Sequence, residues 1–186
     1  MCRIRHARDC PGRGVTTLDP AWLNDRSEFQ LNFIHGLRNP AGLRLQYRLE
    51  DDRVVTDYTA DERHVGFPGF AHGGLVAAIL DDAMGRWAAL LRRWVVTGRL
   101  ETRFRAGAAV GQPLRIEAWM TRVTARAVHA ESRAVLPDGT AVAEATGTYL
   151  PITRDMQAKM VAAWPGFEAY LSPQPPSSRP PRDPPP

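Results

Sequence analysis

The feature that most constrains the fold is a long helix-forming stretch at residues 73–93, set among segments of strand character. Before it, residues 43–49 alternate apolar and polar side chains with the period of two that is typical of a half-buried strand. The acidic residues 50–52 predict a turn, and Arg53–Thr59 predicts the second strand of a hairpin. A glycine- and proline-rich loop, residues 66–69, then leads into the helix.

After the helix the pattern returns to strands. Four segments have strand character: residues 95–106, 114–124, 127–136 and 141–151. Pro137, Asp138 and Gly139 predict the turn between the last two, and a short helix follows at Arg154–Ala163. Two strands, one long helix and four more strands predict an α+β protein, with one helix laid across a largely antiparallel sheet.

The length of 186 residues, 44% of them hydrophobic, suits one domain with a substantial core. We expect that domain over residues 18–171. Residues 1–17 are polar and predict a flexible leader. Residues 172–186 hold half of the prolines and little that can be buried, which predicts a disordered tail.

Charge and composition disfavour several classes of protein. The net charge of +4 is almost wholly arginine, since Lys159 is the only lysine, and the arginines are scattered. A nucleic-acid-binding protein more often clusters its basic residues. No stretch reaches the roughly 18 to 20 apolar residues of a membrane span, and the leader lacks the apolar core of a secretory signal. We therefore expect a cytoplasmic protein that binds no nucleic acid and has no membrane span.

Metal or disulfide chemistry is equally disfavoured. Cys2 and Cys10 lie in the polar leader, and their spacing fits neither a disulfide framework nor a metal site.

The two aspartates of the long helix differ in their neighbours. At 100° per residue, Asp81 shares a stripe with small or flexible side chains: Ala77, Ala78, Met84, Gly85 and Ala88. An acid on such a stripe is costly unless it is paired or functional, and the stripe would let another backbone or a ligand come close. Asp82 has Arg86 four residues later, which predicts an ordinary ion pair on a solvated helix face.

His72, Gly73 and Gly74 stand where the long helix begins. Two glycines at a helix N-terminus let backbone N–H groups point at a ligand, and the helix dipole favours an anion or a developing oxyanion there. Gly74 is accordingly a predicted substrate-binding residue. Taken alone, the triplet is a weak signal and more often marks a simple turn into a helix.

Taken together, these motifs resemble a known family. The segments are residues 39–43, residues 66–74 ending in His72-Gly73-Gly74, Asp81, residues 97–100 and residues 103–105. Their combination resembles the phenylacetyl-CoA-hydrolysing branch of the hotdog-fold acyl-CoA thioesterases. The resemblance implies a curved antiparallel sheet around the long helix, hydrolysis of acyl-CoA, a homodimer or homotetramer, and no metal or redox cofactor.

The resemblance also implies roles for single residues. Gly73 matches the oxyanion-binding amide, Asp81 the catalytic carboxylate, Thr97 a hydroxyl that supports the attacking water, and His72 the histidine at the mouth of the site. One departure concerns residues 66–71, which carry no Asn or Gln where some relatives have one that assists catalysis. Hydrolysis by an activated water and direct attack through an anhydride therefore both stay open.

Spacing along the helix adds an expectation about assembly. Gly73 and Asp81 are separated by about 12 Å at roughly 1.5 Å per residue, yet a base and an oxyanion donor must meet at one carbonyl. If both are catalytic, two antiparallel helices from two chains must form the site. Arg103 and Arg105 share one strand face and are candidates to bind CoA phosphates.

Three other functions remain alternatives. The first is a non-catalytic protein that senses acyl-CoA, although Asp81 and Thr97 argue for catalysis. The second is a hydratase of the same fold, whose arrangement of His and Asp differs from this one. The third is an interaction protein that works through its proline-rich tail.

Overall fold

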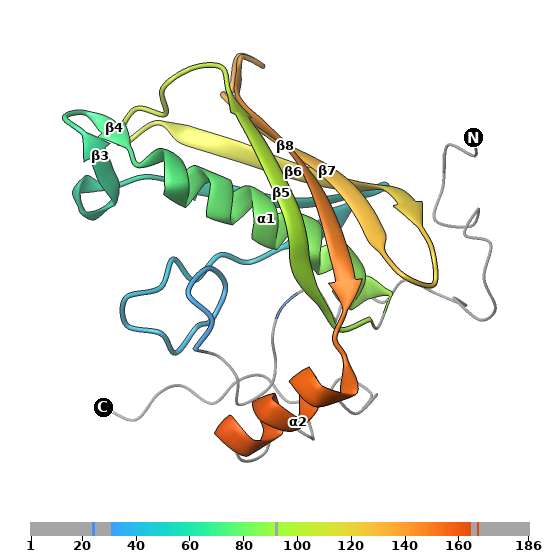
Figure 1. The fold of residues 1–186 in the computed structure, drawn as a ribbon. Helices are drawn as coiled ribbons and strands as arrows, with labels where there is room; N and C mark the ends of the chain where they lie inside the picture. Colours follow the sequence, from blue (N-terminus) through green and yellow to red (C-terminus); the bar gives the residue numbers. More distant parts are fainter. Residues whose placement is uncertain (1–23, 25–30, 92, 165–166, 168–186) are drawn as a thin grey trace.

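The structure is a computed structural model that describes residues 24, 31–91, 93–164 and 167 (Figure 1). The predicted leader, residues 1–17, and the predicted tail, residues 172–186, lie outside the described residues. The domain that was expected between them is described for most of its length.

One curved sheet of six strands forms the body of the fold, with the spatial order β1-β2-β6-β7-β8-β5. Every neighbouring pair is antiparallel. The strands are β1 (Arg48–Glu50), β2 (Arg53–Thr59), β5 (Val95–Phe104), β6 (Pro113–Val123), β7 (Val128–Val135) and β8 (Ala141–Pro151). This is the predicted α+β architecture, and each predicted strand after the helix is present.

The long helix α1 (Gly73–Leu90) lies across one face of this sheet, and the strands curve around it (Figure 1). Its apolar side chains join those of the sheet in one core, in which Ile79, Leu80 and Met84 are almost fully buried. Polar bonds also join the two layers: the Trp87 indole donates to the Ala118 carbonyl at 2.9 Å. The helix is therefore held in a fixed register on the sheet.

The alternation predicted for residues 43–49 is present, but most of that segment is not in the sheet. Leu45 and Tyr47 are buried while Arg44 and Gln46 are exposed. Only the end of the segment pairs with β2, because the Leu45 N–H donates instead to the Ile34 carbonyl of the preceding loop. The side-chain period is that of a strand, whereas the hydrogen-bond partners are those of a loop.

The glycine- and proline-rich segment before α1 is more ordered than a plain loop. A 3-10 turn (Glu62–His64) leads into a small hairpin of β3 (Val65–Phe67) and β4 (Phe70–Ala71). Gly69 has φ +82°, a conformation that glycine adopts without strain. This hairpin delivers the chain to the first turn of α1.

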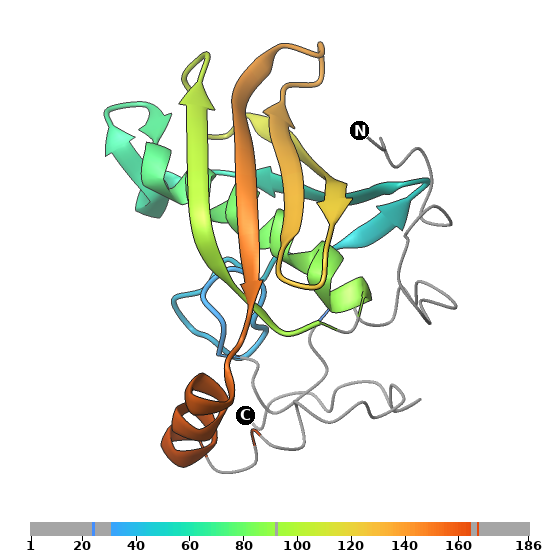
Figure 2. The same ribbon diagram turned by 45° about the vertical axis from the view of Figure 1, so that its right-hand side comes forward.

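Helix α2 (Arg154–Ala163) forms where it was predicted, at the end of β8 (Figure 2). Thr153 caps it by accepting a bond from the Met156 amide at 3.2 Å. None of its described residues is buried, so the helix adds little to the core.

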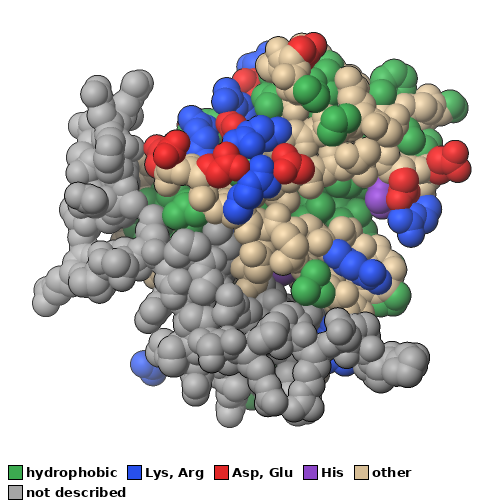
Figure 3. Space-filling model, turned by 180° about the vertical axis from the view of Figure 1, so that it is seen from behind, with side chains coloured by type: hydrophobic (Ala, Val, Ile, Leu, Met, Phe, Trp, Pro, Cys, Tyr) green, Lys and Arg blue, Asp and Glu red, His purple; other side chains and the backbone are tan. Residues whose placement is uncertain are grey.

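Acidic and basic side chains lie side by side on the face seen from behind (Figure 3). Ion pairs run across the strands: Arg115 joins Glu50 and Glu117, and Glu117 joins Arg133 at 2.8 Å. These arginines therefore do not form a patch of one sign. Within the described residues, no helix is long and apolar enough to cross a membrane.

Candidate active site

Asp81 sits on the side of α1 that faces β5 and β8. The hydroxyl of Thr97, on β5, lies 3.1 Å from each oxygen of the Asp81 carboxylate. The hydroxyl of Tyr149, on β8, lies 2.8 Å from Oδ1 and 3.0 Å from the Asp81 carbonyl oxygen. The structure thus brings together the predicted pair Asp81 and Thr97, and it adds Tyr149.

The surroundings of Asp81 change its acidity. Burial raises the pKa of the Asp81 carboxyl above its ordinary value, and the neighbouring Asp82 charge acts in the same direction. The Tyr149 and Thr97 hydroxyls act in the opposite direction, since they donate to the ionised form. The net pKa is raised, which makes this carboxylate a better proton acceptor than an exposed aspartate.

Tyr149 was not among the residues predicted from the sequence. It lies far from Asp81 along the chain and occupies one of many alternating positions in β8. The available signal was Gly147, because a glycine inside a strand often marks a close approach. A Cβ at Gly147 would lie 2.6 Å from Cε2 of the Tyr149 ring.

The start of α1 forms the other half of the predicted site. His72 is the N-cap, and its Nδ1 accepts a bond from the Gly74 amide at 3.0 Å. The Leu75 and Val76 amides donate to the His72 carbonyl. The Gly73 amide donates to no acceptor within the part of the chain that the structure describes, so it is the N–H group of this turn left for a ligand.

Gly74 and Gly66 shape this turn through the space they leave. A Cβ at Gly74 would lie 3.0 Å from Nδ1 and Cε1 of the His72 ring. A Cβ at Gly66, on β3, would lie 2.7 Å from the His72 Cα. The Gly74 amide already donates to His72, so the structural role of Gly74 is to leave room for the His72 ring.

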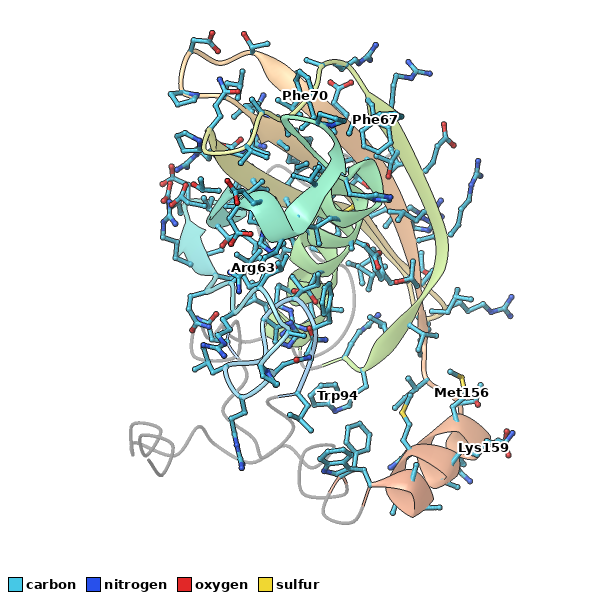
Figure 4. All side chains as sticks on the ribbon, turned by 90° about the vertical axis from the view of Figure 1, so that its left-hand side faces the viewer. Arg63, Phe67, Phe70, Trp94, Met156 and Lys159 are labelled. Atoms are coloured by element: carbon cyan, nitrogen blue, oxygen red, sulfur yellow. The ribbon has the colours of Figure 1, made fainter. Side chains whose placement is uncertain are left out.

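Exposed aromatic side chains lie near the start of α1. Phe67 and Phe70, on the small hairpin beside the start of α1, are 79% and 47% exposed (Figure 4). Phe104, on β5, is 52% exposed, and its ring lies 3.3 Å from where a Cβ on Gly73 would be. Phe104 therefore gives Gly73 an apolar neighbour.

This geometry agrees with comparisons to known proteins. Residues 68–143 match the thioesterase superfamily. A crystal structure of a thioesterase superfamily protein aligns with a TM-score of 0.62 at 22% identity, over 72% of this chain and 69% of that one. The chain has the hotdog fold. The predicted resemblance to hotdog thioesterases is thereby confirmed.

Two other solved hotdog structures carry more specific descriptions. A hypothetical thioesterase from Streptococcus pneumoniae, with coenzyme A, aligns at 18% identity over 57% of this chain and 87% of that one (TM-score 0.54). An N-to-D variant of the phenylacetic acid degradation protein PaaI from Thermus thermophilus aligns at 22% identity over 59% and 95% (TM-score 0.54). Among curated proteins, no sequence matches the chain.

Variants of the Streptococcus pneumoniae protein have also been solved. In one a threonine is replaced by alanine, and in another an aspartate is replaced by alanine. Those two positions are as far apart along that chain as Asp81 and Thr97 are along this one.

Within this hotdog fold, the predicted phosphate-binding arginines lie apart from the two halves of the site. Arg103 and Arg105 flank Phe104, so they project from the opposite face of β5. Arg105 is paired with Glu144 at 2.7 Å. Arg103 borders a shallow hollow of about 350 Å³ on that outer face. Neither guanidinium is on the side of the sheet that carries Asp81.

The expectation that Asp82 lies on a solvated face is wrong. Its side chain is only 12% exposed, and both carboxylate oxygens lie 3.0 Å from Nδ1 of His35, a buried residue of the loop before β1. The predicted partner Arg86 is present at 3.8 Å, but its side chain is 14% exposed. The loop folds over this side of the hotdog helix and takes the pair out of water.

The small-residue stripe around Asp81 has a neighbour within the same chain at one position. Gly85 lies on that stripe, one turn beyond Asp81. A Cβ there would lie 4.0 Å from the Tyr149 ring of the same chain. This is an ordinary van der Waals distance, so the approach of a second chain over this stripe stays a prediction.

Within the described residues, no group of three or more His, Cys, Asp or Glu side chains is placed to hold a metal ion. The groups at hand for chemistry are a carboxylate, two hydroxyls, a histidine and a backbone amide.

Proposed function

We propose that this protein is a cytoplasmic acyl-CoA thioesterase that works as a homodimer or a homotetramer. The observation that carries the proposal is the Asp81 carboxylate, held by the Thr97 hydroxyl on an otherwise apolar helix face. A half-buried acid that has a raised pKa and is bonded by neutral hydroxyls suits proton transfer better than a structural ion pair.

The proposed reaction has two parts. Asp81 takes a proton from a water that the Thr97 hydroxyl helps to hold, and the water oxygen attacks the thioester carbonyl carbon. The Gly73 amide and the helix dipole stabilise the resulting oxyanion. The carbon–sulfur bond then breaks, and the proton passes from Asp81 to the leaving thiolate. Direct attack by Asp81 through an anhydride uses the same groups, and we favour the water route because it gives Thr97 a role.

The proposed site needs two chains. Gly73 and Asp81 lie on one straight helix, about 12 Å apart at roughly 1.5 Å per residue. Strand β5 is at the edge of the sheet, and its residues 97–101 are exposed. A second copy approaching over this edge would set its Gly73 beside Asp81 of the first, giving two composite sites.

The solved relatives support the ligand and the residue pair. The Streptococcus pneumoniae thioesterase was solved with coenzyme A, and alanine variants were made at an aspartate and a threonine with the spacing of Asp81 and Thr97. We carry over from this that the ligand is an acyl thioester of CoA and that Asp81 and Thr97 act together.

Thiol release from aliphatic and aryl acyl-CoAs, followed with a thiol reagent, tests the activity. Gly73→Pro then tests the oxyanion donor, because proline is well accepted at the first helical position and has no N–H. His72, at φ −63° and ψ 126°, already has the conformation favoured before proline. We expect turnover to fall by about 10²- to 10³-fold. The control Gly73→Ala adds a Cβ toward Phe104 but keeps the N–H.

Mixing the two inactive variants tests the composite site. A dimer of one Gly73→Pro chain and one Asp81→Asn chain has one site with both groups intact, so random mixing should restore about a quarter of wild-type turnover. No recovery, in a mixture shown by mass to contain both chains in one dimer, would place each site within a single chain. Wild-type protein that releases no thiol from any acyl-CoA would remove the hydrolase function.

A further inference from the structure

Among the described residues, Tyr149 is the one group bonded to Asp81 that the proposed reaction does not yet use. Its hydroxyl is within hydrogen-bond distance of two oxygens, Oδ1 at 2.8 Å and the helix carbonyl at 3.0 Å. A tyrosine hydroxyl has a single proton to donate. The carboxylate oxygen is nearer and, when ionised, is the stronger acceptor, whereas the carbonyl belongs to the hydrogen-bond ladder of the helix. The bond to Oδ1 is therefore the principal one.

Gly147 leaves a seat for the Tyr149 ring. A Cβ at Gly147, on the same face of β8, would lie 2.6 Å from the ring and 2.7 Å from the hydroxyl oxygen. On α1, the ring edge lies 4.0 Å from where a Cβ on Gly85 would be, so the ring also packs against the helix at an ordinary contact distance. Glycine in the middle of a helix or strand costs roughly 0.5–1 kcal/mol relative to alanine. At Gly147 this cost is the condition for placing the ring, because any larger residue there would clash with it.

The bonds to the carboxylate are unequal. Thr97 is 3.1 Å from both oxygens, while Tyr149 reaches only Oδ1. Oδ1 thus has two donors near it and Oδ2 has one. The oxygen with fewer donors keeps more of its lone-pair capacity for a new proton or a new bond.

We propose that Tyr149 is a positioning residue, which fixes the Asp81 carboxylate through Oδ1 and leaves Oδ2 as the oxygen that reacts. This rests on the proposed function, because a reacting oxygen requires a reaction. Tyr149 does not itself meet the substrate in this proposal: it is buried behind Asp81, between the helix and β8.

The test replaces Tyr149 by Phe in the full-length protein, which keeps the ring in its seat and removes the hydroxyl. We expect kcat to fall roughly ten- to one-hundred-fold through loss of orientation, with KM unchanged. The acid limb of the pH profile should move to higher pH, because a donor to the ionised carboxylate is lost. Tyr58→Phe is the matched control: Tyr58 is also buried, and its hydroxyl has no bond partner within the described residues.

A second measurement does not depend on turnover. The Asp81 carboxyl carbon is titrated by NMR in wild type and in Tyr149→Phe, and its signal is assigned by its absence from Asp81→Asn. The proposal expects the carboxyl pKa to be higher in Tyr149→Phe than in wild type and unchanged in Tyr58→Phe.

The two measurements distinguish failure of the positioning role from failure of the hydrolase function. Wild-type kcat in Tyr149→Phe overturns the positioning role, and so does a lowered kcat with an unmoved Asp81 titration, which would make the tyrosine purely structural. If wild type hydrolyses no acyl-CoA, the hydrolase function fails, and the assignment of Oδ2 fails with it. The titration then still decides the bond: an upward shift supports it and no shift overturns it.

Discussion

Asp81 and Asp82 are neighbours on one helix, yet they stand in opposite surroundings. Asp81 faces β5 and β8, where its partners are the neutral hydroxyls of Thr97 and Tyr149. Asp82 is turned by about 100° toward the loop before β1, where His35 and Arg86 face it.

The two surroundings shift acidity in opposite directions. Burial raises the pKa of the Asp81 carboxyl, and the hydroxyls offset this only in part. Burial also acts to raise the pKa of Asp82, but the charge of Arg86 and the bond from His35 outweigh it, so the pKa of that carboxyl is lowered. Burial alone therefore does not decide the role of an acid. A countercharge holds one aspartate ionised as a structural anchor, while its absence leaves the other available for proton transfer.

Asp81→Asn should have the largest effect, a loss of turnover without a loss of stability. We expect turnover to fall by about 10³-fold, since general-base catalysis is worth roughly 10²- to 10⁴-fold. Asparagine can still accept the bonds from Thr97 and Tyr149 and carries no buried charge, so the unfolding midpoint should be higher at neutral pH. Thiol-release kinetics and urea unfolding measure the two effects. Near wild-type turnover would remove Asp81 from the chemistry.

Asp82→Asn should have the opposite effect, a loss of stability with turnover largely kept. Removing the negative charge that His35 and Arg86 face should lower the free energy of unfolding by about 3 kcal/mol, as for other broken buried pairs. The catalytic groups stay in place, so turnover by the folded protein should change far less than in Asp81→Asn. Urea unfolding measures the loss.

Asp155→Asn is the matched control for that variant. Asp155 and Lys159 form an acid-before-base pair with the same helical spacing, 2.8 Å apart, but both side chains are largely exposed. Their loss should change stability little. An equal loss in the two variants would show that burial gives the Asp82 pair no special weight.

The pH dependence of stability should differ in sign between the two aspartates, and this is the smallest effect. The stabilisation from Asp82 is full above the ordinary aspartate pKa and is lost as the pH falls through its lowered folded pKa. Asp81 instead costs stability as the pH rises from the ordinary value through its raised folded pKa. Asp81→Asn should therefore be more stable than wild type at neutral pH and equal to it in acid.

Urea unfolding at a series of pH values tests this for both variants. The kcat/KM of wild type should also fall as the solution is acidified. The fall should begin at a higher pH than the ordinary aspartate pKa would give, because Asp81 must be ionised to act. Two stability differences with the same sign would contradict the contrast between the neighbours.

The helices, most strands and the pairing of Asp81 with Thr97 could be predicted from the sequence. The glycine turn at His72 marked the start of α1, and period-two patterns located the strands that follow it. The pairing of Asp81 with Thr97 was expected through the family resemblance. These features depend on local spacing, which a sequence displays directly.

The rest depends on how distant segments pack. The loop that carries His35 folds over α1 and takes Asp82 out of water, which the favourable spacing of Asp82 and Arg86 does not reveal. Tyr149 reaches Asp81 only because β8 lies under the middle of the helix. Gly147 carried the one signal for that approach, and that signal is ambiguous because strand glycines also occur at bulges and tight bends.

The edge strand β5 has a further consequence. It is ten residues long, whereas β1 at the other edge has three. A long free edge is a template on which extended chains of other molecules can add and aggregate. The charges of Arg99 and Glu101 and the irregular register beside Thr97 oppose such addition only in part. In the proposed dimer this edge is covered, so a substitution that separated the subunits would lower solubility together with activity.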